Sequence, residues 1–172
     1  MKPNASTHWT TLSTLQGTLF LAASTQGLQG VWFDGQRHFD GPAHAWQRAD
    51  DHPVLVAASG QLRDWYAGQR RQFDLPLAPL GTPFQQAVWT ALRQIDHGQT
   101  RTYGELAAAL GRPAASRAVG AATGRNPLSI VIPCHRLVGR DGALTGYAGG
   151  LDRKRALLAF ETRAPGAPFE AA

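Results

Sequence analysis

Hydrophobic and polar residues alternate in short runs near the start of the chain. Residues 9–33 contain the runs WTTLSTL, TLFLAAS and LQGVWF, which are separated by Gly17 and by Gln26-Gly27. Alternation with a period of two puts apolar side chains on one face of a strand, and glycine favours the tight turns between strands. This segment therefore predicts two or three antiparallel strands.

A helical spacing of apolar residues follows between Pro53 and Gly68. Apolar side chains three or four positions apart give a helix with one apolar face, and glycine readily takes the left-handed conformation that ends a helix. The apolar positions are Val54, Leu55, Ala58, Leu62, Trp65 and Tyr66. The first part of the chain is therefore predicted to be a small α/β domain, an antiparallel sheet with one long helix.

Residues 75–81, LPLAPLG, are predicted to link two domains. Two prolines and a glycine favour stiff, extended chain, and the leucines can pack against either neighbour. We place an N-terminal α/β domain at 1–80 and a mostly helical C-terminal domain at 81–163. Residues 164–172, the end of the chain, are predicted to be a disordered tail.

The C-terminal domain is predicted to open with an amphipathic helix. Thr82 suits the N-cap, Pro83 suits the first helical position, and Gln85 completes a capping box. The apolar stripe of this helix consists of Phe84, Val88, Leu92 and Ile95.

Two short helices joined by a glycine-containing turn come next. TYGE at 102–105 is a second capping box, the helix over 106–110 stops at Gly111, and Pro113 begins the helix AASRAVGAA. This arrangement is typical of a helix-turn-helix. The second helix has small residues around one cation, Arg117, so it suits either tight helix packing or close approach to another surface. A lone arginine amid alanines is badly placed in a core.

The only cysteine of the chain, Cys134, stands in the segment SIVIPCHR at 129–136. The β-branched run at 130–132 predicts a short buried strand, which Pro133 ends. A free cysteine is either a small buried hydrophobe or a nucleophile, and a nucleophile needs a base or a positive field to form its thiolate. His135 and Arg136 are the candidates for supplying it.

The segments after the cysteine have simpler patterns. Residues 139–142, GRDG, predict a hairpin turn between two apolar pairs. Residues 146–150, GYAGG, lack the lysine and hydroxyl residue that follow the glycines of a phosphate-binding loop. Residues 152–161 predict a final helix that ends at Glu161.

Charge is distributed unevenly along the 172 residues, whose formal net charge is +5. Residues 1–80 contain six basic and six acidic side chains, whereas residues 81–172 contain eleven and six. The surplus in the second half suits either a polyanionic partner or a solvated basic face.

We expect a cytoplasmic protein. The segment MKPNASTHWT has no apolar core of the length that a secretory signal needs, and no run approaches a membrane span. A single unpaired thiol also suits a reducing compartment. His38, His44 and His52 lack the spacing of metal ligands, so we predict no metal site.

Motifs from Thr82 to Glu161 together resemble the O6-alkylguanine-DNA alkyltransferases, also called methylated-DNA–protein-cysteine methyltransferases. They are TPFQQAVW, TYGELA, SRAVG, Asn126-Pro127, IPCHR, and GYAGG followed by LDRKRALLAFE, in that family's order and spacing. The resemblance implies a ribonuclease H-like first domain that supports a winged-helix-like second domain, which binds DNA and accepts the alkyl group.

The resemblance also implies the chemistry. A Cys134 thiolate takes the methyl or alkyl group from O6-alkylguanine in duplex DNA, with O4-alkylthymine as a second candidate substrate, and the protein inactivates itself. His135, oriented by Glu161, draws the thiol proton through a water, and Asn126 braces the segment. Tyr103 donates to the departing guanine. No cofactor is implied, because the alkyl group comes from the lesion.

Further positions correspond to the family's contacts with DNA. Arg117 takes the place of the base that is rotated out of the duplex, and Tyr103 crowds the target phosphate. Residues 147–149 form the lip of the guanine pocket, where Ala148 replaces a serine of many relatives. The predicted DNA-binding residues are Arg117, Tyr103, Ala115, Ala118, Gly120 and Arg125, and the predicted substrate-binding residues are Tyr147, Ala148 and Gly149.

Two other classes of function remain open at this stage. A DNA-binding sensor would use the helix-turn-helix without chemistry, but such alkyltransferase-like proteins lack the acceptor cysteine. A Cys-His hydrolase would turn over small esters and would not need Arg117. The expected partner is duplex DNA that contains O6-alkylguanine, with no membrane association and no obligate protein partner.

Overall fold

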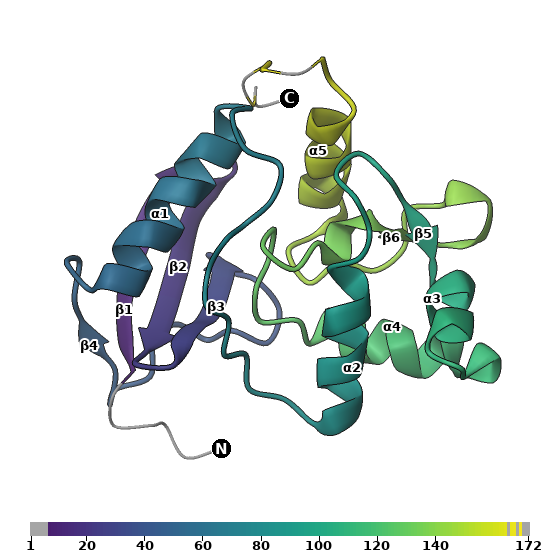
Figure 1. The fold of residues 1–172 in the computed structure, drawn as a ribbon, viewed down its shortest axis with the longest axis horizontal. Helices are drawn as coiled ribbons and strands as arrows, with labels where there is room; N and C mark the ends of the chain where they lie inside the picture. Colours follow the sequence, from purple (N-terminus) through teal and green to yellow (C-terminus); the bar gives the residue numbers. More distant parts are fainter. Residues whose placement is uncertain (1–6, 165, 168, 170–172) are drawn as a thin grey trace. The chain divides into compact units, whose positions relative to one another are not determined.

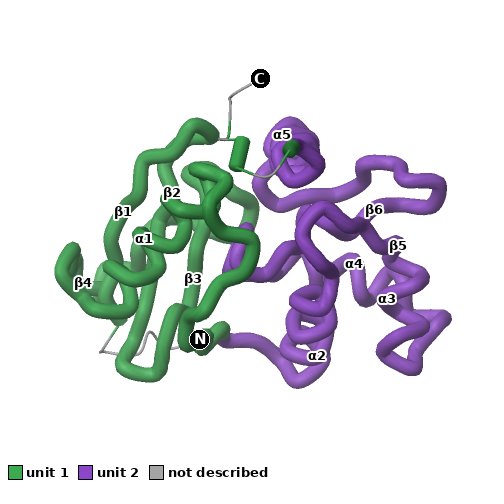
Figure 2. The backbone as a smooth tube through the Cα atoms, turned by 45° about the horizontal axis from the view of Figure 1, so that its top comes forward, with its two compact units in different colours: residues 1–79, 164–172 green, residues 80–163 purple. Residues whose placement is uncertain are grey.

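The computed structural model describes residues 7–164, 166, 167 and 169. It contains two compact units, one formed by residues 1–79 with 164–172 and the other by residues 80–163 (Figure 2). Within the described residues, no helix has the length and apolar character that crossing a membrane requires.

The first unit is built on a four-stranded sheet with the order β3-β2-β1-β4 (Figure 1). Two or three antiparallel strands were predicted over 9–33, and the structure has three, β1 (His8–Thr14), β2 (Gly17–Ser24) and β3 (Gly27–Phe33), which pair antiparallel. The sheet as a whole is mixed, however, because β4 (Gln47–Arg48) pairs parallel to β1. A long connection after β3 carries β4 to the opposite edge of the sheet, beside β1. A tight turn would instead have placed β4 antiparallel to β3.

Helix α1 (Pro53–Tyr66) lies over this sheet, as Figure 1 shows. Its residues Leu55 and Leu62 are fully buried, as are Leu19 and Leu21 of β2. The helix ends where predicted, because Gly68 has a φ of +73° and its N–H donates to the carbonyl of Trp65 at 2.9 Å.

The segment predicted as a linker pairs with the sheet before it leaves the first unit. The N–H of Leu28 donates to the carbonyl of Pro76 at 2.7 Å, and the carbonyl of Leu28 accepts from Ala78 at 2.8 Å. This pairing needs Gly27, whose φ is +142°, because a Cβ there would lie 2.4 Å from the Pro76 oxygen.

The tail predicted as disordered over 164–172 is described only at residues 164, 166, 167 and 169. Phe169 is 2% exposed, its N–H donates to the carbonyl of Tyr66 at 2.8 Å, and its ring lies 5.2 Å from the Tyr66 ring. The prediction is wrong for Phe169, because this aromatic side chain is buried beside the end of α1. Residues 165, 168 and 170–172 lie outside the described residues.

The second unit is mostly helical, and its helices begin as the sequence predicts. Thr82 with Gln85 and Thr102 with Glu105 form complete capping boxes at the start of α2 and α3. The predicted turn at 139–142 is present, since Gly139 N donates to the Ala143 carbonyl at 2.8 Å, but the predicted hairpin pairing is wrong, because β6 pairs parallel with β5. In chain order the elements are α2 (Pro83–Leu92), β5 (Arg101–Thr102), α3 (Tyr103–Ala109), η1 (Pro113–Ala115), α4 (Ser116–Gly124), η2 (Cys134–Arg136), β6 (Leu137–Val138), η3 (Arg140–Gly142) and α5 (Leu151–Glu161).

Helices α3 and α4, which form the predicted helix-turn-helix, pack against each other and against α2. Val88, Leu92 and Leu106 are fully buried, and so is Val119 on the inner side of α4. The indole Nε1 of Trp89 donates to the carbonyl of Ala122 at 2.9 Å. Helix α4 is thus held against both α2 and α3.

Candidate active site

Cys134 lies in a tight turn and not at the end of a strand. Residues 129–132 form local bonds, in which Val131 N donates to the Ser129 carbonyl and Ile132 N to the Leu128 carbonyl, both at 2.8 Å. Ile130 has a φ of +70°, which is strained for a β-branched residue. The predicted strand is therefore wrong, and Cys134 instead begins the 3₁₀ turn η2, with 6% of its surface exposed.

The side chain of Asn126 accounts for this departure. Its Oδ1 accepts from Leu128 N at 3.0 Å, and its Nδ2 donates to the Ile132 carbonyl at 2.9 Å. The same Nδ2 lies 3.0 Å from Sγ of Cys134. The Asn126 amide hydrogen-bonds to backbone groups that would pair with a neighbouring strand if this segment were a strand. The same side chain therefore both closes the turn and orients the sulfur.

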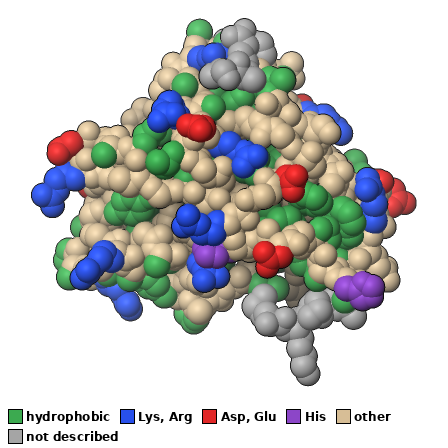
Figure 3. Space-filling model, turned by 180° about the vertical axis from the view of Figure 1, so that it is seen from behind, with side chains coloured by type: hydrophobic (Ala, Val, Ile, Leu, Met, Phe, Trp, Pro, Cys, Tyr) green, Lys and Arg blue, Asp and Glu red, His purple; other side chains and the backbone are tan. Residues whose placement is uncertain are grey.

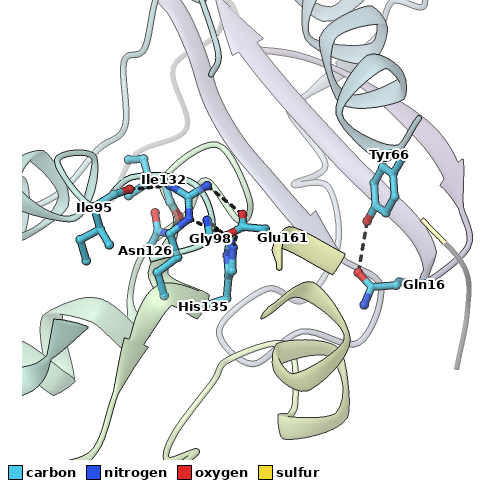
Figure 4. A network of polar contacts seen from close by, with 9 residues as sticks. Gln16, Tyr66, Ile95, Gly98, Asn126, Ile132, His135 and Glu161 are labelled. Atoms are coloured by element: carbon cyan, nitrogen blue, oxygen red, sulfur yellow. Dashed lines mark hydrogen bonds and ion pairs between the residues drawn. The ribbon is translucent and has the colours of Figure 1, made fainter. Parts of the chain in front are cut away.

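Glu161 is the buried centre of the polar network beside the cysteine, and its two oxygens receive four donors. Oε1 lies 2.9 Å from His135 Nε2 and 2.7 Å from NH2 of Arg136. Oε2 accepts from Nε of Arg136 at 2.8 Å and from Gly98 N at 3.2 Å. Figure 4 shows His135, Gly98 and Glu161 converging. The carboxylate is thus fully hydrogen-bonded, although only 4% of Glu161 is exposed.

The charges and hydrogen bonds in this network determine the protonation state and the tautomer of the His135 imidazole. Burial raises the pKa of Glu161, but the hydrogen bonds from His135 and Arg136 and the charge of Arg136 act in the opposite direction and hold that pKa below its usual range. Burial lowers the pKa of His135, so the ring is neutral at pH 7 and Arg136 is the cation that keeps Glu161 ionised. An ionised carboxylate only accepts, so Nε2 carries the proton and Nδ1 is the basic nitrogen.

Cys134 rests as a thiol that can be activated. Burial raises its pKa, whereas the Asn126 hydrogen bond and the charge of Lys154 act in the opposite direction. Nδ1 of His135 has no hydrogen-bond partner among the residues that the structure describes. The site therefore pairs a thiol of raised pKa with a nearby buried base.

Lys154 is a second buried cation at this site. Its Nζ is fully buried and donates to the carbonyls of Leu137 at 2.5 Å, Thr145 at 2.8 Å and Gly146 at 3.3 Å. The hydroxyl of Tyr103 donates to the same Thr145 carbonyl at 3.1 Å. Helices α3 and α5 thus hold one stretch of chain through two donors.

Helix α4 presents small residues and one cation on its outer side. Arg117 and Ala118 are exposed, Ala115 and Gly120 are half-buried, and Arg125 is exposed just after the helix. A Cβ on Gly120 would lie 3.6 Å from the ring of Tyr103, so the helix also borders that tyrosine. Lys and Arg side chains recur across the face that Figure 3 presents, with Asp and Glu side chains between them.

Comparison with known proteins identifies the family. The family model of the 6-O-methylguanine DNA methyltransferase DNA binding domain matches residues 83–163. A methylated-DNA–protein-cysteine methyltransferase of Methanosarcina acetivorans is 47% identical over 84% of this chain and 92% of its own length. This chain belongs to that family. The resemblance drawn from the motifs is therefore confirmed.

Solved structures of methyltransferases have the same fold. Mycobacterium tuberculosis OGT in complex with DNA is 43% identical, with a TM-score of 0.84 over 94% of this chain and 95% of that one. The O6-methylguanine methyltransferase of the same organism gives 42% and 0.82 over 95% and 96%. The predicted division into an α/β part and a helical part is confirmed by these matches.

The methyltransferase residues predicted from the sequence fall into groups. Cys134, His135, Glu161 and Asn126 are buried together around the turn and α5. The hydroxyl of Tyr103 instead shares the Thr145 carbonyl with Nζ of Lys154. The predicted pocket lip lies between η3 and α5, where Tyr147 and Ala148 are half-buried and the buried Gly149 accepts a hydrogen bond from Arg153 at 3.0 Å.

Sequence reasoning missed the roles of two methyltransferase residues. The sequence indicated Arg136 only as a candidate source of positive field, and it indicated no role for Lys154. Lys154 precedes Leu157 and Glu161 by three and seven positions, which places it on the buried side of α5. That spacing was the signal available.

Proposed function

We propose that this methyltransferase repairs O6-alkylguanine in duplex DNA by moving the alkyl group onto Sγ of Cys134, once per molecule. The observation that carries the proposal is the single thiol, held by Asn126 at 3.0 Å beside the buried His135–Glu161 pair. O4-alkylthymine is a second candidate substrate. No cofactor enters the reaction, because the alkyl group comes from the lesion and stays on the protein.

The proposed transfer is a substitution at saturated carbon. Neutral His135 takes the thiol proton at Nδ1 through a water, and the thiolate forms the S–C bond while the C–O6 bond breaks. The electron pair stays with guanine, which receives a proton from the hydroxyl of Tyr103. The product is a thioether without a good leaving group, so the protein is not regenerated.

We assign DNA binding to the outer side of α4. Its small residues, Ala115, Ala118 and Gly120, permit close approach to a groove, and the exposed Arg117 is long enough to fill the gap that a rotated base leaves. Arg125 adds a phosphate contact. Tyr103, which borders Gly120, is placed to act on the flipped nucleotide.

We assign the flipped base to a pocket whose lip includes Tyr147, Ala148 and Gly149. The Tyr147 ring offers a stacking surface, and the Ala148 backbone offers a donor where a serine side chain is missing. The finer fold assignments, ribonuclease H-like for unit 1 and winged-helix-like for unit 2, belong to the same proposal. So does action in the cytoplasm, which suits a single unpaired thiol.

Intact-protein mass spectrometry tests the function. Reaction with a duplex that contains O6-methylguanine should add one methyl group per protein, on the peptide that holds Cys134, and then stop. Cys134→Ser should bind the duplex but transfer nothing, because a hydroxyl is hardly ionised near neutral pH. Repeated turnover would support a hydrolase, and duplex binding without added mass would support a sensor.

A further inference from the structure

Arg136 is a buried cation that the reaction outlined above does not use. It is 6% exposed, and it holds Glu161 with a two-pronged contact through Nε at 2.8 Å and NH2 at 2.7 Å. Its remaining nitrogen, NH1, donates to the carbonyl of Ile95 at 2.5 Å. All three nitrogens of the guanidinium are therefore used within unit 2, and the group is fixed in position.

This arrangement changes what Glu161 does to His135. A carboxylate that faces an imidazole by itself stabilises the protonated ring, because an ion pair forms between them. Here the guanidinium already compensates that negative charge. Burial is the largest influence on the pKa of His135; among the described residues, the charge of Glu161 raises that pKa, and the charges of Arg136 and Lys154 lower it. Two cations thus oppose one anion around His135.

We propose that Arg136 is a positioning residue for alkyl transfer, which neutralises and orients Glu161 so that His135 stays uncharged with Nδ1 able to accept the thiol proton. The inference rests on the proposed function, in which His135 is the base. Glu161 then acts mainly to hold the Nε2–H tautomer, at 2.9 Å, and not to charge the ring.

Nitrogen NMR of the imidazoles tests the inference without reference to activity. In the unaltered protein, His135 should be neutral at pH 7 and protonated at Nε2. In Arg136→Met, the pKa of His135 should rise by about one to three units, since an unopposed carboxylate then faces the ring. Alkyl transfer at pH 7 should fall about tenfold for each unit by which that pKa exceeds 7, and it should recover at higher pH.

Three further variants separate charge from packing. Arg136→Lys keeps the cation and should keep His135 neutral, even where stability falls. Arg136→Met combined with Glu161→Gln removes both charges and should also return the ring to its neutral form. Arg48→Met is the matched control, because it breaks an exposed arginine–carboxylate pair, Arg48 with Asp50 at 3.2 Å, in unit 1 and should change neither readout.

The outcomes distinguish this inference from the function on which it rests. A neutral His135 in folded Arg136→Met, or a protonated one in Arg136→Lys, would overturn the role of Arg136. Where Arg136→Met fails to fold, the lysine and double variants decide the matter by the same spectra. Failure of the unaltered protein to alkylate Cys134, or full activity of His135→Ala, would instead refute the proposed function.

Discussion

At the scale of single residues, the candidate site is a set of buried polar groups that compensate one another. Glu161 has four donors, Asn126 ties the sulfur to its own turn, and Lys154 reaches three carbonyls. A buried charge without such partners would cost several kcal/mol. The function proposed for Cys134 therefore depends on residues that never touch the substrate.

Lys154 allows a direct test at this scale. Burial lowers the pKa of the Lys154 amine to about 8. The chain has one other lysine, Lys2, so the two amine signals can be followed separately. NMR of the two lysine side chains across pH should show one amine that titrates near pH 8, and Lys154→Met should remove that signal.

The same substitution should slow alkyl transfer about tenfold, the order expected from losing hydrogen bonds to a charged group. Arg155→Met on the exposed side of α5 is the control, measured on the free alkylated base. If both lysine amines titrate together near the ordinary lysine pKa, Lys154 is solvated and does not hold the carbonyls of Leu137, Thr145 and Gly146.

At the scale of elements, two short pieces of chain have more importance than their length suggests. The turn at 129–132 replaces a predicted strand, because the Asn126 side chain takes its backbone groups. Helix α4 packs through Val119 and Ala122 and leaves Arg117 exposed. The turn is buried and positions Cys134, whereas α4 keeps an exposed side for the proposed DNA contact.

Arg117→Ala tests the role of α4. We expect transfer from duplex DNA to slow by about tenfold or more, because unstacking a base costs a few kcal/mol that the arginine helps to offset. Transfer from the free alkylated base should stay within about twofold, since no stack needs filling. Rates are measured by single-turnover assays on both substrates.

Arg125→Ala is the matched control for this experiment, because Arg125 is also exposed but lies beyond the helix. It should weaken duplex binding in a salt-dependent way and leave base rotation intact. Equal slowing of Arg117→Ala on duplex and free base would show that Arg117 is structural.

At the scale of the whole molecule, each unit has its own core, and the polar network belongs entirely to unit 2. The surplus of positive charge also lies in the second half of the chain. We therefore expect the stability of unit 2, and with it the activity, to depend on the protonation of buried groups more than on surface charge.

The expected pH dependence follows from two lowered pKa values. The pKa of His135 in the folded protein lies below the ordinary 6.5. Below about pH 6.5 the unfolded chain therefore binds a proton that the folded protein does not bind, and the free energy of unfolding decreases as the pH falls. Glu161 has a pKa below the ordinary 4.5, so the stability that it provides above that value is lost as pH falls further. Urea denaturation at pH 7.5, 5.5 and about 4 should show both steps.

Removing an exposed carboxylate provides the comparison for this prediction. Asp152→Asn breaks the surface pair with Arg155 and should leave the pH dependence unchanged. The combined variant Arg136→Met with Glu161→Gln should lose the lower step. Stability that stays constant from pH 7.5 to about 4 would contradict the buried network.

The sequence by itself determined the features that depend on local chemistry. Alternation and helical spacing predicted two or three strands, α1 and the helices of the second half, and both capping boxes were readable from four consecutive residues. The uniqueness of Cys134 and the order of the motifs indicated the family. Predictions from these signals hold in the folded protein because they depend only on neighbours along the chain or on residues on one face of one element.

Only the tertiary structure decided how distant residues share charge. An Ile-Val-Ile run favours a strand locally, and Asn126 imposes a turn on it through hydrogen bonds that no periodicity encodes. Arg136 and Lys154 look like ordinary surface cations in the sequence, yet both are buried because Glu161 and a set of carbonyls surround them. The protonation of His135 depends on that three-dimensional arrangement of charges, which hydrophobic patterning does not specify.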